Sequence, residues 1–419
     1  MKKVLMIGWE LPPFNSGGLG VACLFMAEAL ARKTDLTFSL PKKLPIDDTN
    51  FLVIFADDSI KSNAKNFSAY MCEDSNGMNE LFNEVESYGE RLYKVIQEKE
   101  LSFDLIHAHD WLSASAAIYL KKKLNIPAII HIHATEIERT GVSPNFEIYD
   151  KEKKAFEQSD ALITVSHQTR EIVYQHYGIS RDKIFAIPNG IDLKIRSAKL
   201  PLYLKKLKQQ GYKLVLFVGR FALQKGPDYF LETLPLVKSY IETPKNKFFG
   251  DKNDKSFLSL FPIDYSARRK KISNKVKYIF CGSGEMMGSL VSRASELNVL
   301  NDVIFSGFLR NNELWGIYQI ADVLVVPSVF DPFGLVPLEG VKYKTPVIIS
   351  KTTGVGDYLI NVLKSDFWDT KKMANLIISA LKYPEMSNEL ARTSYQELEK
   401  FRWEDRTDKI LSIYQGLKI

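Results

Sequence analysis

The sequence predicts an α/β protein with two doubly wound parallel sheets, each covered by helices on both faces. Short apolar runs rich in Val, Ile and Phe alternate with longer helical patterns along almost all of the 419 residues. The runs show little alternation of polar with apolar residues, which is typical of parallel strands buried on both faces. The predicted strands are residues 4–8, 51–55, 103–107, 128–133, 161–165, 184–187, 213–219, 276–281, 303–306, 323–327 and 346–350.

The chain divides into two predicted domains. Residues 1–199 form the first, because its last strand leads into the turn-rich Pro188-Asn189-Gly190. Residues 200–400 form the second, where a new strand pattern begins at Tyr212. Residues 242–277 are charged and rich in turn-forming residues, so we interpret them as a surface insertion rather than a domain.

Composition excludes several classes of protein. A hydrophobic fraction of 45% with 25% charged residues supplies two cores and leaves no stretch that could span a membrane. The net charge of +6 is scattered among acidic residues, which indicates a solvated surface and not a nucleic-acid footprint. Cys23, Cys72 and Cys281 lack the spacing of a disulfide framework or a zinc motif, which favours a reducing, cytoplasmic location. The apolar start ends at Trp9, too early for a signal peptide.

A glycine-rich loop follows the first predicted strand and contains Gly17 and Gly18. A helical pattern at residues 21–33 comes directly after it. Glycines let the backbone approach a ligand closely, and the helix start offers free N–H groups to an anion. The loop is therefore a candidate ligand contact, although a tight turn without a ligand explains it equally well.

Two histidine-containing segments follow neighbouring strands of the first domain. His107 and His109 lie two residues apart just before Asp110, and the pair His131 and His133 repeats the spacing. Because the carboxyl ends of parallel strands line one crevice, Asp110 and His133 are predicted to face the same site. His107 and His131 are interpreted as packed histidines with satisfied hydrogen bonds. No carboxylate cluster completes a coordination set, so the pattern predicts no metal.

In the second domain, two cationic residues, Arg220 and Lys225, follow the predicted strand that ends at Gly219. Arg220 offers a fork of donors and Lys225 a compact charge, and both suit phosphate oxygens. Gly219 precedes them, at the end of the strand. Later strand ends carry further candidates to hold a base or ribose, although ordinary βα turns look much the same; these are Gly282, Gly284 and Phe308.

The most specific segment contains two acids separated by seven residues, Asp331 and Glu339. Asp331 precedes a turn at Gly334, and Glu339 lies on the helix predicted after it. One acid can then bind sugar hydroxyls while the other binds ribose hydroxyls. Between them, the free N–H groups around Gly334 and Leu335 can face a phosphate.

Together these segments resemble the GT-B-fold retaining glycosyltransferases, a family that includes glycogen and starch synthases, sucrose synthases and many mannosyl- and glucosyltransferases. The resemblance covers nearly the whole chain and rests on Gly17-Gly18-Leu19, His109-Asp110-Trp111, His133, residues 188–192, residues 219–226 and the Asp331/Glu339 pair. It implies two Rossmann-like domains that face each other across a cleft, with residues 401–419 as a last helix that crosses back to the first domain.

The resemblance also implies roles and partners. The donor would be a nucleotide-diphosphate sugar, a UDP-, ADP- or GDP-hexose. Arg220 and Lys225 would stabilise the departing diphosphate, and His133 would hydrogen-bond the donor sugar. Asp331 would hold sugar hydroxyls, Glu339 would hold the ribose, and Asp110 would lie beside the acceptor. No metal and no other cofactor is expected, because fixed cations and helix N-termini stabilise the leaving charge.

The predicted activity is that of a hexosyltransferase similar to glycogen or starch synthases, which moves glucose to a glucan or oligosaccharide. Trp9 and Trp111 are expected to pack against sugar rings. Two departures weaken the narrower label. The first acid of the pair is usually Glu, and here it is Asp331. Bacterial glycogen synthases carry Lys in the early loop, where this chain has Asn15.

Two alternatives stay open, and a third is disfavoured. One is a mannosyl- or glucosyltransferase that acts on a lipid-linked or small-molecule acceptor, with peripheral membrane contact through the basic run at residues 119–124. The second is a nucleotide-sugar epimerase on the same fold, which would act on the donor alone. The third, a non-catalytic sugar-nucleotide-binding protein, is disfavoured because both cations and both acids are present together.

Overall fold

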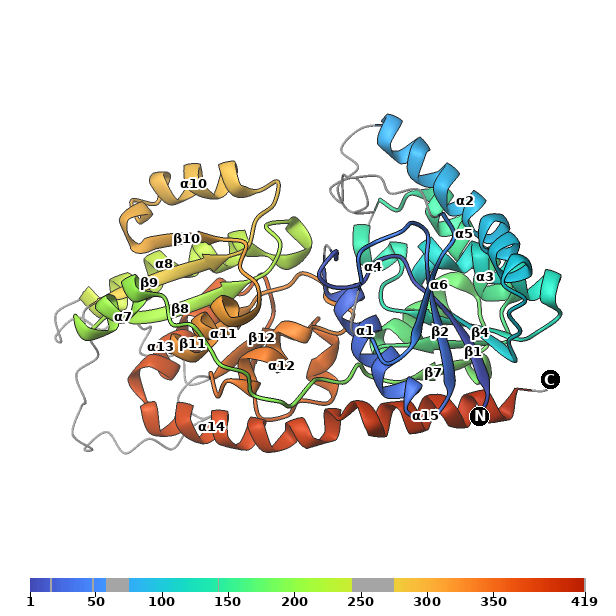
Figure 1. Cartoon of the computed structure of the whole chain (residues 1–419). Coiled ribbons are helices and arrows are strands. Elements are labelled where there is room, and N and C mark those ends of the chain that lie inside the picture. Colours follow the sequence, from blue (N-terminus) through green and yellow to red (C-terminus); the bar gives the residue numbers. More distant parts are fainter. Residues whose placement is uncertain (16, 47–48, 58–74, 142, 243–274, 418–419) are drawn as a thin grey trace.

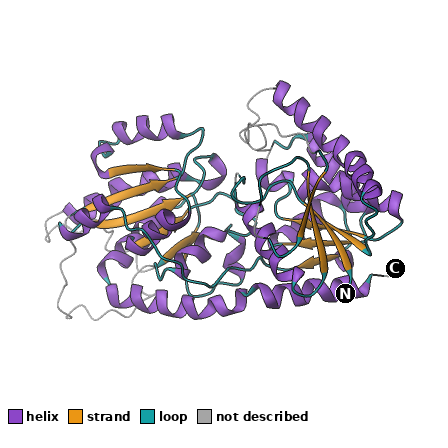
Figure 2. Ribbon diagram, viewed as in Figure 1, coloured by secondary structure: helices purple, strands orange, loops and turns teal. Residues whose placement is uncertain are grey.

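The computed structural model describes residues 1–15, 17–46, 49–57, 75–141, 143–242 and 275–417. It contains two parallel sheets, each with helices on both faces (Figures 1 and 2). The predicted two-sheet α/β architecture is therefore confirmed. Within the described residues, no helix is both long and apolar enough to cross a bilayer.

The first sheet has seven parallel strands in the order β3-β2-β1-β4-β5-β6-β7. The chain order reverses between β1 and β4, where Val4 pairs with Leu105 on one side and with Leu36 on the other. Ligands of open α/β sheets bind beyond the carboxyl ends of the strands at such a reversal. The strands are β1 (Lys3–Ile7), β2 (Asp35–Leu40), β3 (Leu52–Phe55), β4 (Leu105–His109), β5 (Ala128–Ile132), β6 (Ala161–Thr164) and β7 (Ile184–Ala186).

The second sheet has six parallel strands in the order β10-β9-β8-β11-β12-β13. Its reversal lies between β8 and β11, so the loops after these two strands border the corresponding crevice. The predicted Arg220–Lys225 and Asp331 segments are those two loops. The strands are β8 (Lys213–Val218), β9 (Val276–Cys281), β10 (Val303–Gly307), β11 (Val323–Val326), β12 (Val347–Ser350) and β13 (Leu363–Ser365).

Three strands differ from the prediction by more than one residue at an end. β4 begins at Leu105, two residues later than expected, and it includes both His107 and His109. β2 was missed because Asp35-Leu-Thr-Phe-Ser-Leu alternates polar with apolar residues, unlike the other buried strands. Pairing with β1 and β3 nevertheless buries five of its six residues. β13 is a three-residue edge strand with a lysine at its centre, too short to give a pattern.

Helices connect the strands and cover both sheets (Figure 2). The predicted insertion at residues 242–277 falls mostly on residues 243–274, which lie outside the described residues; Glu242 ends a helix before them and Val276 begins β9 after them. The helices are α1 (Gly18–Ala31), α2 (Ser75–Glu98), α3 (Asp110–Leu124), α4 (Glu136–Thr140), α5 (Phe146–Gln158), α6 (His167–Tyr177), α7 (Leu202–Gln209), α8 (Pro227–Glu242), α10 (Met287–Glu296), α11 (Asn311–Ile320), α12 (Leu335–Lys342), α13 (Thr370–Lys382), α14 (Pro384–Glu397) and α15 (Trp403–Gly416).

The last two helices run along one side of both sheets, α14 beside the second and α15 beside the first (Figure 1). α15 packs against α1, and its Trp403, Ile410 and Tyr414 are part of the first sheet's hydrophobic core. Gly190 permits this approach, since a Cβ atom there would lie 2.5 Å from the Trp403 ring. The C-terminal helix therefore stabilises the first sheet by burying apolar surface against it.

Candidate active site

Asp110 is the first residue of α3, directly after β4, and its backbone has a left-handed φ of +56°. Its carboxylate Oδ1 accepts hydrogen bonds from the backbone N–H groups of His133 (2.6 Å) and Ala134 (3.3 Å). Burial raises the pKa of Asp110 to about 6, while Arg139 and the two N–H donors act in the opposite direction. The structure therefore brings Asp110 and His133 together, with Asp110 fixing the backbone that carries the histidine.

His133 is half-buried just beyond β5, and its ring Nε2 lies 3.0 Å from Nδ1 of His109. Burial lowers the pKa of His133 to about 3, so its imidazole is neutral at pH 7. A neutral imidazole can exchange hydrogen bonds with a sugar hydroxyl without adding charge. A neutral His133 in this position is consistent with its predicted role, which is a hydrogen bond to the donor sugar.

The expectation for the two inner histidines is right for one and wrong for the other. Nδ1 of His107 lies 2.5 Å from the hydroxyl of Tyr414, and its Nε2 lies 3.2 Å from Nδ1 of His131, so both nitrogens have partners. Nε2 of His131 is buried and has no hydrogen-bond partner among the described residues, and the same is true of Nε2 of His109. Sheet packing stacks these rings, with the centroid of His131 4.6 Å from that of His133 and 5.5 Å from that of His109.

The expected aromatic platform for sugar rings is also wrong as regards Trp9 and Trp111. Their side chains are buried, with 4% and 5% of their surface exposed. Trp9 packs edge-on against Tyr88, and Trp111 packs against Phe82. Both rings belong to the hydrophobic core beside the first sheet.

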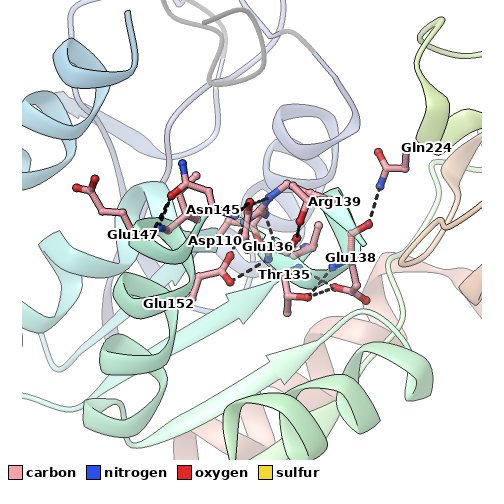
Figure 3. Close-up of polar contacts among 12 residues, drawn as sticks. Asp110, Thr135, Glu136, Glu138, Arg139, Asn145, Glu147, Glu152 and Gln224 are labelled. Carbon is pink, nitrogen blue, oxygen red and sulfur yellow. Dashed lines mark hydrogen bonds and ion pairs between the residues drawn. The ribbon is translucent and has the colours of Figure 1, made fainter. Parts of the chain in front are cut away.

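Sequence reasoning missed Arg139 on the short helix α4. Its guanidinium donates to the carbonyl oxygen of Ala134 (2.6 Å) and to Glu136 (3.2 Å), and it forms an ion pair with Glu152 of α5 (Figure 3). The backbone of Ala134 is thus held at its N–H by Asp110 and at its carbonyl oxygen by Arg139. These contacts fix the loop that follows His133.

A local signal for this helix is present in the sequence. Thr135 and Glu138 form a capping box, in which each side chain accepts from the other residue's backbone N–H. The Thr-x-x-Glu spacing marks a helix start directly after a strand, and Arg139 follows it. The partner Glu152 lies too far along the chain for any spacing to identify.

In the second domain, the structure brings Lys225 and Asp331 together. Nζ of Lys225 lies 2.9 Å from Oδ2 of Asp331, and the lysine keeps 29% of its side chain exposed. Gly226 makes the approach feasible, since a Cβ atom there would lie 2.3 Å from the carbonyl oxygen of Pro327. Arg220 lies at the same strand end with its side chain exposed.

The turn between the two acids presents a helix N-terminus. Gly334 is the N-cap residue of α12 and has a φ of +88°. Because glycine has no side chain, the N-cap leaves the backbone N–H groups of the first turn without a side-chain cap. A Cβ atom at Gly334 would lie 2.7 Å from Thr353, so only glycine fits both the conformation and the space. The N–H groups of this turn begin at Leu335 and supply the positive end of the helix dipole.

The remaining candidates are placed as follows. Oε2 of Glu339 accepts from the hydroxyl of Tyr318 at 2.6 Å, and burial raises the pKa of Glu339. Gly282 and Gly284 pack against the backbone of Gly219 and Phe221, so the turns after β8 and β9 touch without side chains between them. Phe308 keeps 57% of its surface exposed, with the Arg310 guanidinium 4.9 Å from its ring.

Several contacts join the two domains around these groups. A Cβ atom at Gly18 would lie 3.4 Å from Leu335, so the early loop faces the start of α12. Gln224 donates to the backbone carbonyl of Glu138 at 3.4 Å (Figure 3). Arg310, another residue that the sequence did not indicate, donates to the carbonyl oxygens of Pro13 (2.7 Å) and Asn15 (3.2 Å). The carboxyl edges of the two sheets therefore face each other.

Comparison with known proteins agrees with this geometry. The profile of Glycosyltransferase Family 4 matches residues 78–195, and that of Glycosyl transferases group 1 matches residues 263–397. The chain is 27% identical to an uncharacterised glycosyltransferase of Methanocaldococcus jannaschii over 84% of this chain and 81% of that protein. It is 25% identical to a glycogen synthase of Mycobacterium tuberculosis over 99% of this chain and 95% of that protein.

Solved structures show the same fold. A sucrose-phosphate synthase from Thermosynechococcus elongatus superposes with a TM-score of 0.73 at 20% identity, covering 99% of each chain. Anabaena HepE in complex with UDP-glucose superposes with a TM-score of 0.70 at 15% identity, covering 100% of each chain. One profile matches within the first domain and the other within the second, and the structural likeness extends over both. The chain belongs to the group 1 family of glycosyltransferases and has the GT-B fold.

Proposed function

We propose that this glycosyltransferase is a retaining hexosyltransferase that moves glucose from a nucleotide-diphosphate glucose to a glucan or oligosaccharide. The observation that carries the proposal is the Lys225–Asp331 ion pair. It brings a cation and a carboxylate together, next to the N-terminus of α12. A nucleotide-diphosphate sugar has the matching sequence of groups, since its diphosphate is bonded directly to the sugar.

The diphosphate is the leaving group, and its negative charge grows as the bond to the sugar breaks. Lys225, Arg220 and the N–H groups from Leu335 onward supply positive potential at that position. These positive groups are present at the site before the reaction, so they can stabilise the charge as it develops. On this basis we propose that the enzyme needs neither a metal nor another cofactor.

The rest of the donor follows from the same placement. Asp331 and the neutral His133 bind hydroxyls of the sugar from opposite domains, and Asp110 holds the backbone of His133. Glu339 binds the ribose. The backbone around Gly219, Gly282 and Gly284 holds the base against the exposed ring of Phe308, while the N–H groups of Gly17 and Gly18 reach the phosphates.

In the reaction, the bond from the sugar C1 to the diphosphate oxygen breaks and a bond from C1 to the acceptor oxygen forms on the same face. The proton of the acceptor hydroxyl passes to the departing phosphate oxygen. Oδ1 of Asp110 accepts from two backbone N–H groups, so this residue orients the site rather than attacking C1. We therefore propose no covalent sugar–enzyme intermediate.

Two comparisons support glucose and a glucan. The glycogen synthase relative spans 99% of this chain, and HepE was solved with UDP-glucose. The buried free thiols of Cys23 and Cys281 suit a reducing compartment, which supports a cytoplasmic enzyme.

One observation favours a second candidate, transfer to a small-molecule acceptor. The burial of Trp9 and Trp111 removes the aromatic surface that a glucan would use at this edge. A relative from Segniliparus rotundus is a D-inositol 3-phosphate glycosyltransferase, 24% identical over 74% of this chain. A compact acceptor would need no such platform.

Incubation with labelled UDP-, ADP- and GDP-glucose tests the proposal. Maltooligosaccharides should become one α-linked hexose longer, and Lys225→Ala should abolish most of the transfer. Label in a small anionic product would favour the second candidate. Label only in a lipid extract would indicate a lipid-linked acceptor, and a change in the donor alone would indicate an epimerase.

A further inference from the structure

A cluster of metal-ligating side chains lies at the carboxyl edge of the first sheet, and its members come from three elements. Cys23 lies on α1, His109 ends β4, and His133 follows β5. One potential ligand atom of each residue lies within 4.8 Å of those of the other two. No local spacing indicates this set, because Cys23 is far from both histidines along the chain.

The two imidazoles are close enough to bind one ion. His109 ends β4, and His133 lies just beyond the neighbouring strand β5. Nδ1 of His109 and Nε2 of His133 lie 3.0 Å apart. Two nitrogens at the usual ~2.0–2.1 Å from a tetrahedral zinc ion are roughly 3.3–3.4 Å apart, so the pair needs to open by only a few tenths of an ångström.

The charge around the thiol also favours a cation. Asp110 and Glu10 are buried carboxylates, 3% and 6% exposed, and both act electrostatically on Cys23. A divalent cation bound at the thiol offsets this negative potential and displaces the thiol proton. A sulfur ligand with two imidazoles suits zinc better than magnesium or calcium, which prefer oxygen.

A second triplet, His107, His109 and His131, is less suitable. Both nitrogens of His107 already have partners, and all three side chains are fully buried. The triplet with Cys23 includes the half-buried His133, which gives an ion a way in. It also contains a thiol, which zinc binds strongly once the thiol is deprotonated.

We propose that Cys23, His109 and His133 bind one Zn²⁺ ion and that the bound ion inhibits the enzyme. Cys23 binds as the thiolate and releases its proton to solvent, and the fourth position of the ion is left to water. Inhibition follows because the metal occupies His133, the residue that contacts the donor sugar. This inhibitory half rests on the proposed function, whereas the metal-binding half does not.

Titration of the metal-free protein with Co²⁺ tests the binding half without any assay of activity. Tetrahedral Co²⁺ absorbs in the visible, and a thiolate ligand adds a charge-transfer band in the near ultraviolet. The protein should develop both at one Co²⁺ per chain, and excess Zn²⁺ should abolish them. The variant Cys23→Ser should lose the charge-transfer band, and His133→Gln should lose the tetrahedral visible absorption.

The chain provides a matched control, because it contains three cysteines in all. The double variant Cys72→Ser/Cys281→Ser leaves Cys23 as the only thiol and should keep the band. If Cys23→Ser does not fold, this double variant decides by itself. A band that survives Cys23→Ser, or the absence of a band in the folded double variant, would overturn the site.

Zinc-buffered assays of hexose transfer test the inhibitory half. Saturating Zn²⁺ should slow the wild type at least ~10-fold, and Cys23→Ser should need on the order of 10–100-fold more free Zn²⁺ for the same inhibition. Binding of Co²⁺ and Zn²⁺ with unchanged turnover would overturn the inhibition. If no donor is turned over at all, the proposed function fails, but the cobalt spectra still decide the metal site.

Discussion

The carboxyl edges of the two sheets differ in how they hold their polar groups. At the first sheet, Asp110 and Glu152 are almost completely removed from solvent. Arg139 forms an ion pair with Glu152, and Asp110 and Arg139 both hydrogen-bond the backbone of Ala134. At the second, Lys225 keeps 29% of its side chain exposed, and the start of α12 is capped by glycine. The first edge is suited to position a substrate, whereas the second is suited to attract and stabilise a charged one.

The difference in burial between the two edges predicts how variants at each edge should behave. A buried ion pair tolerates the loss of one partner poorly, because the other charge is left desolvated. In the Lys225–Asp331 pair the lysine is partly exposed, so it can exchange the carboxylate for a ligand while water screens its charge. Variants at the first edge should therefore affect folding most, and variants at the second should affect turnover most.

The largest expected effect is at Arg139. Arg139→Met leaves Glu136 and Glu152 buried without their cation, so the free energy of unfolding should fall by about 3–5 kcal/mol in urea titrations. The control Arg293→Met, in an exposed ion pair with Glu232, should cost no more than about 1 kcal/mol. Equal losses of unfolding free energy in the two variants would show that the buried ion pairs contribute no more to stability than the exposed one does.

The next effect concerns the pH dependence of stability. Burial raises the pKa of Asp110 from 3.8 to about 6, so the folded chain binds this proton more tightly than the unfolded chain does. The contribution of Asp110 should therefore decrease as pH rises from about 4 to about 6, by up to about 3 kcal/mol. Asp110→Asn keeps an acceptor oxygen but removes this dependence.

Urea unfolding of both proteins between pH 4 and 7 measures the difference. Glu138 also titrates in this region, because burial raises its pKa to about 7. The comparison should therefore be repeated in a Glu138→Gln background, where the Asp110 contribution should persist. A difference that does not change with pH would contradict the prediction.

Lys225→Ala should lower kcat by about 10²-fold with a smaller change in the donor KM, because the charge it stabilises is greatest in the transition state. Lys208 is a matched control, since it pairs with Asp322 at 2.7 Å with 33% of its side chain exposed. Lys208→Ala should leave kcat nearly unchanged. Similar rates for both variants would mean that Lys225 is only a surface cation.

A smaller effect is expected at Arg310, which joins the second domain to the loop at Pro13 and Asn15. Arg310→Ala should raise the donor KM several-fold, in line with the roughly 0.5–1.5 kcal/mol of such hydrogen bonds. It should also loosen the contact between the domains. Small-angle scattering with and without donor nucleotide should show less compaction than in the wild type; identical curves would contradict this role.

The smallest expected effect is that of chelation. Because fixed cations stabilise the leaving group, EDTA should not reduce transfer, and it should raise the activity of any protein that carries zinc at Cys23. Initial rates before and after dialysis against EDTA measure this. Loss of activity in EDTA that Mg²⁺ or Mn²⁺ restores would refute the metal-free mechanism.

Local patterns in the sequence are sufficient to predict the two parallel sheets and the loops that follow their strands. Buried parallel strands leave continuous apolar runs, and the residues after each run lie at one edge by geometry alone. Asp110, His133, Lys225 and Asp331 are therefore assigned to strand ends by the sequence alone. The capping box at Thr135 is a further local signal of the same kind, because its spacing marks the start of α4.

Only the tertiary structure decided which of these groups meet. Arg139 reaches Glu152, Arg310 reaches the backbone at Pro13, and Cys23 approaches His109 and His133 because whole elements pack together. The same packing buried Trp9 and Trp111, which the sequence had suggested for sugar contact. Periodicity reports which face of an element is apolar, but it carries no information on which distant side chains share that face. Contacts between residues far apart in the chain depend on the helix and strand arrangement as a whole.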